Sequence, residues 1–339
     1  MKKGFVFGKF LPFHKGHEAM IRFALTQCDF LTVLICVSDQ EQLPGKMRKS
    51  WMDETFAGIT NLDIRIFDYE EALLPNSSVS SETISEIWAT AFSRLLPDHT
   101  LLITSEPYGA YVARFMGIQH IPFDPQRIQV PVSATAIRKD PAAWWKFLPS
   151  SVKPDLNVKV VILGTESTGK TTLTAQLADH FHATAVLEAG RDLIDDSNEF
   201  SIDDLYLVAN AHATIIDDAS RGNSPLLIID TDVHITISYG RYAFATALDL
   251  SPEIFRKNRA DIYLYLNNDV PFVQDGTRLS QEERDKLDAF HRQTLQDYHI
   301  PFEEITGNWE ERFAKAVALT KAAMERKIDW IAGLASPHT

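Results

Sequence analysis

The sequence predicts an α/β protein with two doubly wound parallel-sheet domains. Apolar runs of strand length alternate with helical patterns along the chain, as expected for βαβ units around parallel sheets. At 339 residues the chain is longer than one hydrophobic core usually organises. A fresh apolar strand, VKVVILG, follows a segment with two prolines and a polar turn cluster. We therefore expect one domain over residues 1–148, a linker over residues 149–157 and a second domain over residues 158–330.

The individual elements follow from the local patterns. Strands are expected near residues 4–8, 31–38, 64–67, 100–104 and 119–123, and in the second domain near 158–163, 226–230, 261–266 and 302–305. The segment LSQEERDKLDAFHRQTLQDY predicts a helix, because Ser280 and Glu283 match a capping box. Leu287, Phe290 and Leu295 then fall near one face of that helix.

Composition limits the classes of function. The net charge of −13 and the lack of a clustered basic segment argue against binding of nucleic acid. Cys28 and Cys36 form no CxxC motif and no even framework, so we expect no disulfide and a reducing compartment. The longest apolar runs have strand length, not membrane length. We expect a cytoplasmic protein that does not bind membranes.

The segment GTESTGKT matches the phosphate-binding pattern G-x-x-x-x-G-K-[ST]. The apolar strand KVVIL precedes it, and a helical pattern with Leu173 and Leu177 on one face follows it, as the motif requires. Lys170 is expected to reach the β and γ phosphates of ATP, and the Thr171 hydroxyl to bind Mg²⁺. A glycine-rich turn without a ligand is the alternative. The residues predicted to bind ATP here are Gly164, Ser167, Thr168, Gly169, Lys170, Thr171 and Thr172.

Two further segments fit a phosphoryl-transfer site. PLLIIDTD ends an apolar strand in Asp230 and Asp232. We assign Asp230 to the metal and Asp232 to the base that receives the proton of the attacking hydroxyl, although the reverse assignment stays open. In PFVQDGTRLS, Arg278 is placed to close over the transferring phosphoryl group. A GTPase is disfavoured because no N-K-x-D segment occurs.

The loop after the first strand, GKFLPFHKGH, carries His14 and His17. Two histidines without a third ligand make a weak metal site. In a doubly wound sheet this loop is the favoured phosphate site, where imidazole N–H groups and a helix N-terminus can hold a triphosphate. VSATAIRKDP offers a second phosphate-binding segment, with Ser133 as N-cap, Thr135 in the first turn and Arg138 one turn on. Nucleotidyl transfer to another phosphate fits, because an ionised acceptor requires no strong base.

GKFLPFHKGH and VSATAIR resemble the HxGH and ISxTxIR motifs of the nucleotidylyltransferase superfamily. Over nearly all of residues 3–325 the chain resembles the NadR-like bifunctional family, which joins a nicotinamide-nucleotide adenylyltransferase to a ribosylnicotinamide kinase. The segments that carry this resemblance follow the family order: RKSWMDETF, TSEPYG, DPQR, WWKFLPSSVKP, GTESTGKT, EAGRD, IIDTD and PFVQDGTR. The resemblance implies a Rossmann-like HxGH nucleotidylyltransferase domain followed by a P-loop kinase domain.

The resemblance also implies the ligands and their residues. The substrates would be ATP, nicotinamide riboside and nicotinamide mononucleotide, the final product NAD, and the metal Mg²⁺. Catalytic roles would fall on His14, His17, Arg138, Lys170, Asp232 and Arg278. The first ATP site would add Gly8, Lys9, Phe10, Arg48, Ser133 and Thr135. Trp88 would either stack on the nicotinamide ring or lie in the core, and the kinase substrate would meet Glu188, Arg191 and Asp275.

Several alternatives stay open at this point. A coenzyme A synthase-like fusion shares both main motifs but gives no reason for RKSW, TSEPYG or PFVQDGTR. A nucleotide-sensing protein with one inactive domain is a second alternative. Leu187 stands where the family has an aromatic residue, so the riboside pocket of the kinase is altered. Some relatives carry an N-terminal helix-turn-helix, whereas this sequence starts at the first strand, and we expect no operator binding. A homo-oligomer and use of the deamidated mononucleotide are both left open.

Overall fold

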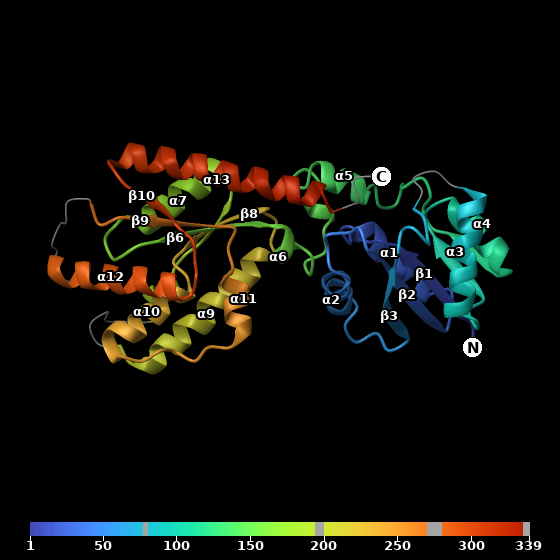
Figure 1. Cartoon of the computed structure of the whole chain (residues 1–339), viewed down its shortest axis with the longest axis horizontal. Helices are drawn as coiled ribbons and strands as arrows, with labels where there is room; N and C mark the ends of the chain where they lie inside the picture. Colours follow the sequence, from blue (N-terminus) through green and yellow to red (C-terminus); the bar gives the residue numbers. More distant parts are fainter. Residues whose placement is uncertain (77–80, 194–199, 270–279, 335–339) are drawn as a thin grey trace. The chain divides into compact units, whose positions relative to one another are not determined.

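A computed structural model describes the chain except for residues 77–80, 194–199, 270–279 and 335–339. The described chain divides into two compact units (Figure 1). One comprises Met1–Lys153 together with Ile328–Thr339, and the other comprises Pro154–Lys327. Each unit has its own five-stranded sheet. We describe the two units separately.

The first unit has a parallel sheet with strand order β3-β2-β1-β4-β5. Its strands are β1 (Lys3–Gly8), β2 (Phe30–Ser38), β3 (Leu62–Tyr69), β4 (Leu101–Thr104) and β5 (Gln119–Pro122). Its helices are α1 (Lys15–Leu25), α2 (Gly45–Thr55), α3 (Glu82–Leu95), α4 (Tyr108–Met116) and α5 (Ala134–Lys139), with a 3₁₀ turn at Trp145–Phe147. The predicted strands all form, and the doubly wound fold is confirmed.

The central strand β1 fixes the position of the first site. Gly4 on β1 pairs with Leu31 on β2 and with Leu101 on β4, so the order of strands reverses direction at β1. In such a sheet a crevice opens beyond the carboxyl ends of the strands at this reversal. The loop between β1 and α1 and the loop after β4 therefore lead into the same crevice.

The second unit has a parallel sheet with strand order β10-β9-β6-β8-β7. Its strands are β6 (Val158–Leu163), β7 (Thr184–Val186), β8 (Leu226–Asp230), β9 (Ile262–Leu266) and β10 (Glu303–Ile305). The helices are α6 (Lys153–Leu156), α7 (Lys170–Phe181), α8 (Gly190–Leu193), α9 (Ile202–Ser220), α10 (Val233–Phe244), α11 (Pro252–Asn258), α12 (Gln281–Asp297) and α13 (Trp309–Ala332).

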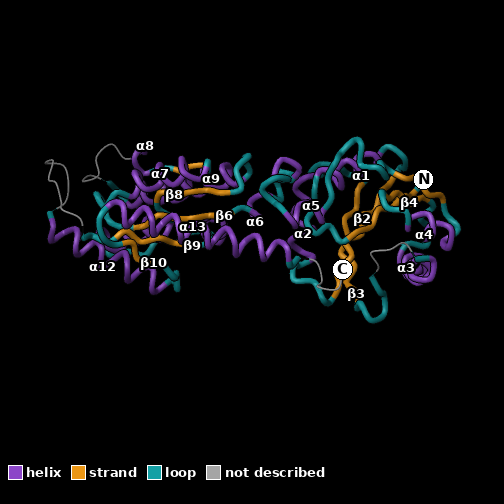
Figure 2. The backbone as a smooth tube through the Cα atoms, turned by 90° about the horizontal axis from the view of Figure 1, so that it is seen from above, coloured by secondary structure: helices purple, strands orange, loops and turns teal. Residues whose placement is uncertain are grey.

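Alternate side chains of β6 enter the cores on the two faces of this sheet. Val160 and Ile162 pack with Leu173 of α7, whereas Val161 and Leu163 pack in the other core with residues of α9, α10 and α12. Figure 2 shows the strands of this unit between purple helices. A central parallel strand buried on both faces reads as a continuous apolar run, which explains why VKVVIL was recognisable.

Three details differ from the sequence-based expectations. The short strand β7 was not predicted, and the segment expected as a linker contains the helix α6. The capping box of Ser280 and Glu283 forms as predicted, and Leu287 and Leu295 are fully buried. Phe290, however, is 41% exposed. At 100° per residue it lies about 140° around the helix from Leu295, so both cannot face the core. No helix in the described part of the chain is both long and apolar enough to cross a bilayer.

Candidate active sites

His14 and His17 stand at the start of α1, directly beyond the end of β1. His14 is the N-cap, and its Nδ1 accepts the backbone N–H of Gly16 at 3.1 Å and of His17 at 3.3 Å. A Cβ on Gly16 would lie 3.0 Å from the His14 ring, so glycine keeps this turn tight. The two imidazoles stack with their centroids 3.6 Å apart. Because Nδ1 of His14 is an acceptor, its proton resides on Nε2.

Both histidines are neutral near pH 7. Burial, reinforced by the positive charge of Arg127, lowers the pKa of His14 from 6.5 to about 3. Burial lowers the pKa of His17 well below 6.5, and His14 and Arg127 add to the effect. The Nδ1 atom of His17 is buried and has no hydrogen-bond partner among the described residues. The pair thus offers neutral N–H donors rather than fixed positive charge.

These histidines predict a pH-dependent stability. A group whose pKa is lower in the folded protein stabilises the fold fully above its unfolded pKa, and this contribution is lost as the pH falls. For His14 the loss spans the range from 6.5 to about 3. Between pH 7 and pH 5, each such imidazole should lower the free energy of unfolding by an amount on the order of 1–2 kcal/mol. Urea unfolding at pH 7 and pH 5 measures this difference, and equal midpoints with unchanged slopes would contradict it.

A cavity of about 420 Å³ opens at these histidines in the first unit. The predicted site residues that line it are Gly8, Lys9, Phe10, His14, His17, Trp88, Ser133, Thr135 and Arg138. Ser133 caps α5, as expected, by accepting the N–H of Ala136 at 3.1 Å. Arg138 donates to the Leu11 carbonyl at 2.6 Å and to the Thr135 hydroxyl at 3.3 Å. The structure thus brings the HxGH loop and the VSATAIR segment to one cavity.

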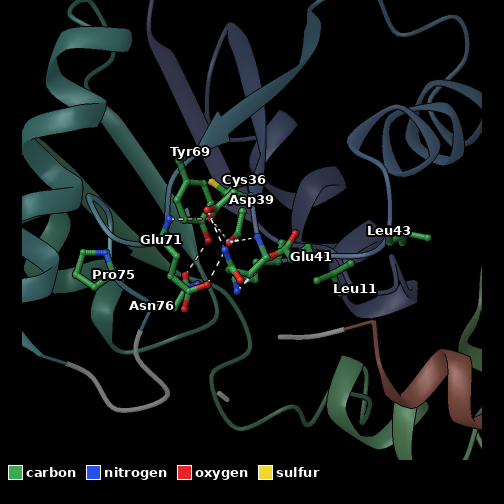
Figure 3. Close-up of polar contacts among 12 residues, drawn as sticks. Leu11, Cys36, Asp39, Glu41, Leu43, Tyr69, Glu71, Pro75 and Asn76 are labelled. Atoms are coloured by element: carbon green, nitrogen blue, oxygen red, sulfur yellow. Dashed lines mark hydrogen bonds and ion pairs between the residues drawn. The ribbon is translucent and has the colours of Figure 1, made fainter. Parts of the chain in front are cut away.

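Arg48 does not line this cavity, although the sequence placed it in the ATP site. Its side chain is fully buried, and it donates to the carbonyl oxygens of Lys9 at 2.8 Å and Leu43 at 2.6 Å. The buried Glu41 side chain is drawn in Figure 3. Its carboxylate lies 2.7 Å from Arg48 and 3.1 Å from the Lys9 ammonium, as ion pairs without hydrogen-bond alignment. Arg48 therefore ties the loop after β1 to the loop after β2. Its contribution to the site is to hold the Lys9 backbone.

Trp88 is a core residue that also lines the cavity, so neither of the two roles that the sequence left open excludes the other. It is 9% exposed and packs in the core with Phe92 and against Phe7, whose ring lies 6.4 Å away at 18°. Its indole N–H donates to the Pro75 carbonyl at 3.1 Å. It also lines the cavity. This core residue therefore offers an apolar wall to a bound ring.

The phosphate-loop motif in the second unit connects β6 to α7. Gly164 has a φ of +139°, and a Cβ there would lie 2.7 Å from the Leu266 carbonyl oxygen. Gly169 caps α7 with a φ of +93°, and a Cβ there would meet the Trp309 ring at 2.8 Å. Both glycines are thus required by conformation and by space. Ser167, at φ +62°, continues the same loop.

The side chains of this loop contact the loop's own backbone and the end of β8. Lys170 is buried and donates to the Thr165 carbonyl at 3.0 Å, and Thr168 donates to the same oxygen at 2.8 Å. The Thr171 hydroxyl donates to Asp230 at 2.5 Å. Thr172 is exposed. The loop and the end of β8 are therefore in contact, as the pairing of these two motifs predicted.

Asp230 and Asp232 differ in their surroundings. Asp230 is fully buried and touches the phosphate loop through Thr171. Asp232, also fully buried, caps α10 through the His234 N–H at 3.0 Å and binds the His234 ring at 2.6 Å. Burial alone would lower the pKa of His234, but the Asp232 carboxylate raises it above its usual value. Both Asp232 oxygens thus hold the start of α10, which is a poor setting for the predicted base.

The predicted substrate residues of the kinase are only partly described. Glu188 is half-buried near Tyr239, whose hydroxyl donates to Glu166 at 3.4 Å. Burial and then the charges of Glu166 and Glu188 raise the pKa of Tyr239 well above 10. Arg191 lies on α8, but its side chain is outside the described part of the structure. Asp275 and Arg278 also lie outside the described residues.

Sequence reasoning missed two buried arginines that support the phosphate loop. Arg312 of α13 donates to the Thr168 carbonyl at 3.2 Å, and Arg284 of α12 donates to the Glu166 carbonyl at 3.1 Å. Both are almost completely buried. Arg284 precedes the buried Leu287 by three residues, so helical periodicity places it on the buried face. A charged residue at such a position requires a specific partner, and this was the available signal.

His291 of α12 was also missed. It is fully buried, its Nδ1 lies 2.8 Å from the Ser238 hydroxyl, and its Nε2 has no partner among the described residues. Burial and the nearby charge of Lys170 lower its pKa to about 3. It follows Leu287 by four residues on the same helical face. The second unit should therefore lose stability on acidification in the same direction as the first.

The chain resembles known proteins over nearly its full length. The AAA domain family matches residues 159–312. The chain is 28% identical over 348 residues to the trifunctional NAD biosynthesis/regulator protein NadR of Escherichia coli (strain K12), in an alignment that covers 95% of this chain and 83% of that protein. The NadR protein of Salmonella typhimurium (strain LT2) gives the same identity and coverage.

Solved structures show the same fold. A crystal structure of NadR protein in complex with NR has a TM-score of 0.65 and 21% identity, and the match covers 97% of this chain and 96% of that one. A crystal structure of NadR protein with NAD and AMP-PNP gives the same values. The chain is therefore NadR-like in sequence and in fold.

Proposed function

We propose that this chain is a bifunctional NAD salvage enzyme. Its second domain phosphorylates nicotinamide riboside with ATP, and its first domain joins the resulting nicotinamide mononucleotide to ATP, giving NAD and pyrophosphate. The observation that carries the proposal is the presence of two separate phosphate-binding loops, each beyond the central strand of its own sheet, in a chain that is NadR-like over 95% of its length. The domain limits proposed from the sequence, 1–148 and 158–330, go with this assignment.

The adenylyl transfer proceeds by direct displacement. An oxygen of the mononucleotide phosphate attacks the α phosphorus of ATP, and the bond to pyrophosphate breaks. The attacking phosphate is already ionised at pH 7, so the site supplies position and charge stabilisation. His14 and His17 donate N–H groups to the transferring adenylyl phosphate, and Arg138 supplies positive charge. The remaining ATP ligands are Gly8, Lys9, Phe10, Ser133 and Thr135, with Trp88 against the nicotinamide ring.

The kinase reaction transfers the γ phosphoryl group to a riboside hydroxyl. The backbone of the loop from Gly164 to Gly169 and the Lys170 ammonium bind the phosphates. The Thr171 hydroxyl and Asp230 carboxylate suit Mg²⁺, because they are oxygen donors in contact and Mg²⁺ uses few protein ligands beside phosphates and water. When bound, Mg²⁺ would neutralise negative charge on the phosphates of ATP. Arg278 closes over the phosphoryl group, and Glu188, Arg191 and Asp275 hold the riboside.

One further role in the kinase reaction is that of the carboxylate that accepts the proton of the riboside hydroxyl. Asp232 was assigned to it from sequence, but its two oxygens hold His234 and the start of α10. Glu188 is half-buried, and its charge acts on Tyr239 beside the phosphate loop. We therefore propose Glu188, ahead of Asp232, as the carboxylate that faces the riboside hydroxyl. We also propose a cytoplasmic location, in line with two cysteines that are both free thiols.

A time course with the purified chain tests the proposal. Mg-ATP and nicotinamide riboside should give first the mononucleotide and then NAD, separated by chromatography. The same assay with phosphopantetheine and dephospho-coenzyme A as acceptors should give no product. Conversion of added mononucleotide without any use of the riboside would restrict the proposal to the first domain. The failure to phosphorylate the riboside would then be attributed to the pocket around Leu187. Turnover of the pantetheine acceptors alone would replace it by the coenzyme A alternative.

A further inference from the structure

An ion pair at the cavity of the first unit lies outside the HxGH loop and the VSATAIR segment, in the segments TSEPYG and DPQR, whose residues had no assigned role. Nη2 of Arg127 lies 2.8 Å from Oε1 of Glu106, and both residues line the cavity. Glu106 follows β4, and Arg127 follows β5. Each side chain is 45% exposed. A half-exposed pair of this kind is worth little to stability, so its position calls for another explanation.

The backbone holds Arg127 in this position through a tight turn. The Asp124 carboxylate accepts the N–H groups of Ile128 at 2.8 Å, Gln129 at 3.0 Å and Val130 at 3.1 Å. The Arg127 N–H donates to the Asp124 carbonyl at 2.8 Å. Arg127 has a φ of +53° and Asp124 a φ of +41°, a conformation that non-glycine residues adopt at a cost. The turn therefore holds the backbone of Arg127 at the cavity, which Asp124 also lines.

The other lysine and arginine that line this cavity already have roles in the proposed adenylyl transfer, and both also contact groups of the protein. Arg138 is bound to the Leu11 carbonyl, and Lys9 faces the buried Glu41. Arg127 uses one guanidinium nitrogen for an exposed carboxylate, and a guanidinium has five N–H donors in a fork that matches phosphate. Its charge reaches His14 and His17, since it lowers the pKa of both. Arg127 is thus the exchangeable cation beside the histidines among the described lining residues.

We propose that Arg127 binds a phosphate group of a substrate by exchanging the Glu106 carboxylate for it, and that Asp124 is the positioning residue that presents Arg127. Glu106 holds the guanidinium while the cavity is empty and competes with the incoming phosphate. The inference rests on the proposed adenylyl transfer. The phosphate is that of the mononucleotide or belongs to the triphosphate of ATP, and the KM values for the two substrates distinguish them.

Arg127→Ala should raise the KM for the phosphate substrate that it binds by about tenfold or more, because a charge-assisted hydrogen bond is lost. Glu106→Gln should change this KM in the opposite direction. It removes the competitor and should lower the same KM by about 1.4- to 5-fold, and this gain should vanish in the Arg127→Ala background. A purely structural ion pair would give losses in both variants. Asp124→Ala should reproduce much of the Arg127→Ala loss, and Asp124→Asn should restore part of it through its remaining acceptor oxygen.

Arg114→Ala is the matched control, because Arg114 forms an exposed pair with Glu82 at 3.1 Å and does not line the cavity. It should leave both KM values unchanged. If the wild-type chain forms no NAD, the proposed function fails, and calorimetric titration with ATP and with the mononucleotide still tests Arg127. That titration uses a Lys170→Ala background to weaken ATP binding in the other unit. Affinities within twofold of each other with and without Arg127, for both ligands, would overturn the inference.

Discussion

His17→Ala is expected to reduce NAD formation from nicotinamide mononucleotide and ATP by about a hundredfold to a thousandfold. Its neutral imidazole stacks on His14 at the start of α1, with one buried nitrogen that no described group satisfies. A donor aimed at charge that develops in the transition state contributes on this scale. The substitution leaves Lys170 and the phosphate loop of the second unit untouched. Phosphorylation of the riboside should therefore continue at the wild-type rate.

The two activities of one chain make the experiment self-controlled. NAD formation and mononucleotide formation are measured on the same preparation, and the kinase rate reports whether the protein is folded and active. His99→Ala is the matched substitution, because His99 is a half-buried histidine of the same unit that does not line the cavity. It should keep NAD formation. Equal losses in the two histidine variants, or a loss of both activities in His17→Ala, would contradict a direct role of His17.

Local sequence patterns predicted the fold because they coincide with its physical requirements. A strand buried on both faces favours apolar residues, and β6 is apolar from Val160 to Leu163. A tight loop before a helix N-terminus needs glycine where a Cβ would strike a neighbour, and Gly164 and Gly169 are such positions. Ser133 and Ser280 cap their helices as their spacing predicted. The serine caps contact residues close in sequence, and the positive φ of the two glycines is a local property of the loop, although the atoms that a Cβ would strike, on Leu266 and Trp309, lie far along the chain.

Residues whose partners lie far along the chain could not be assigned in this way. The carbonyl oxygens that fix Arg48 belong to other loops, and Arg312 contacts the phosphate loop from the last helix. Asp232, assigned as the base, is an exception with a local partner, because the His234 ring two residues further on contacts it at the start of α10. The Arg127 turn depends on the positive φ of two residues other than glycine, and spacing alone gives no sign of it.

The buried arginines have a common physical role. Arg48, predicted as an ATP ligand, and Arg284 and Arg312, to which the sequence assigned no role, bind backbone carbonyl oxygens and hold loops in place. A guanidinium has five N–H donors, so it can hydrogen-bond to several carbonyl oxygens that a loop leaves unpaired. Arg127 differs because it is half-exposed and pairs with an exposed carboxylate. Exposure and partner type, which the sequence does not carry, separate loop-holding arginines from substrate-binding ones.

Lys170→Ala should have the reverse effect of His17→Ala. We expect phosphorylation of nicotinamide riboside to fall by about a hundredfold or more, because the positive charge that meets the β and γ phosphates is lost. NAD formation from added mononucleotide should continue. The buried ammonium donates to the Thr165 carbonyl, so its removal takes away one of the two donors of that oxygen, the other being the Thr168 hydroxyl, and will cost some stability in the second unit. A melting curve for each variant measures this separate cost.

Lys170→Met tests the role of the Lys170 charge in a second way, because it keeps most of the buried aliphatic volume and removes only the ammonium group. Both variants should show the same loss of kinase rate if charge at the phosphates is the cause. With riboside and ATP as the starting substrates, neither variant should accumulate NAD, and adding the mononucleotide should restore it. If NAD formation from added mononucleotide also fell in Lys170→Met while its unfolding was unchanged, the two sites would be coupled, and the assignment of one reaction to each unit would be wrong.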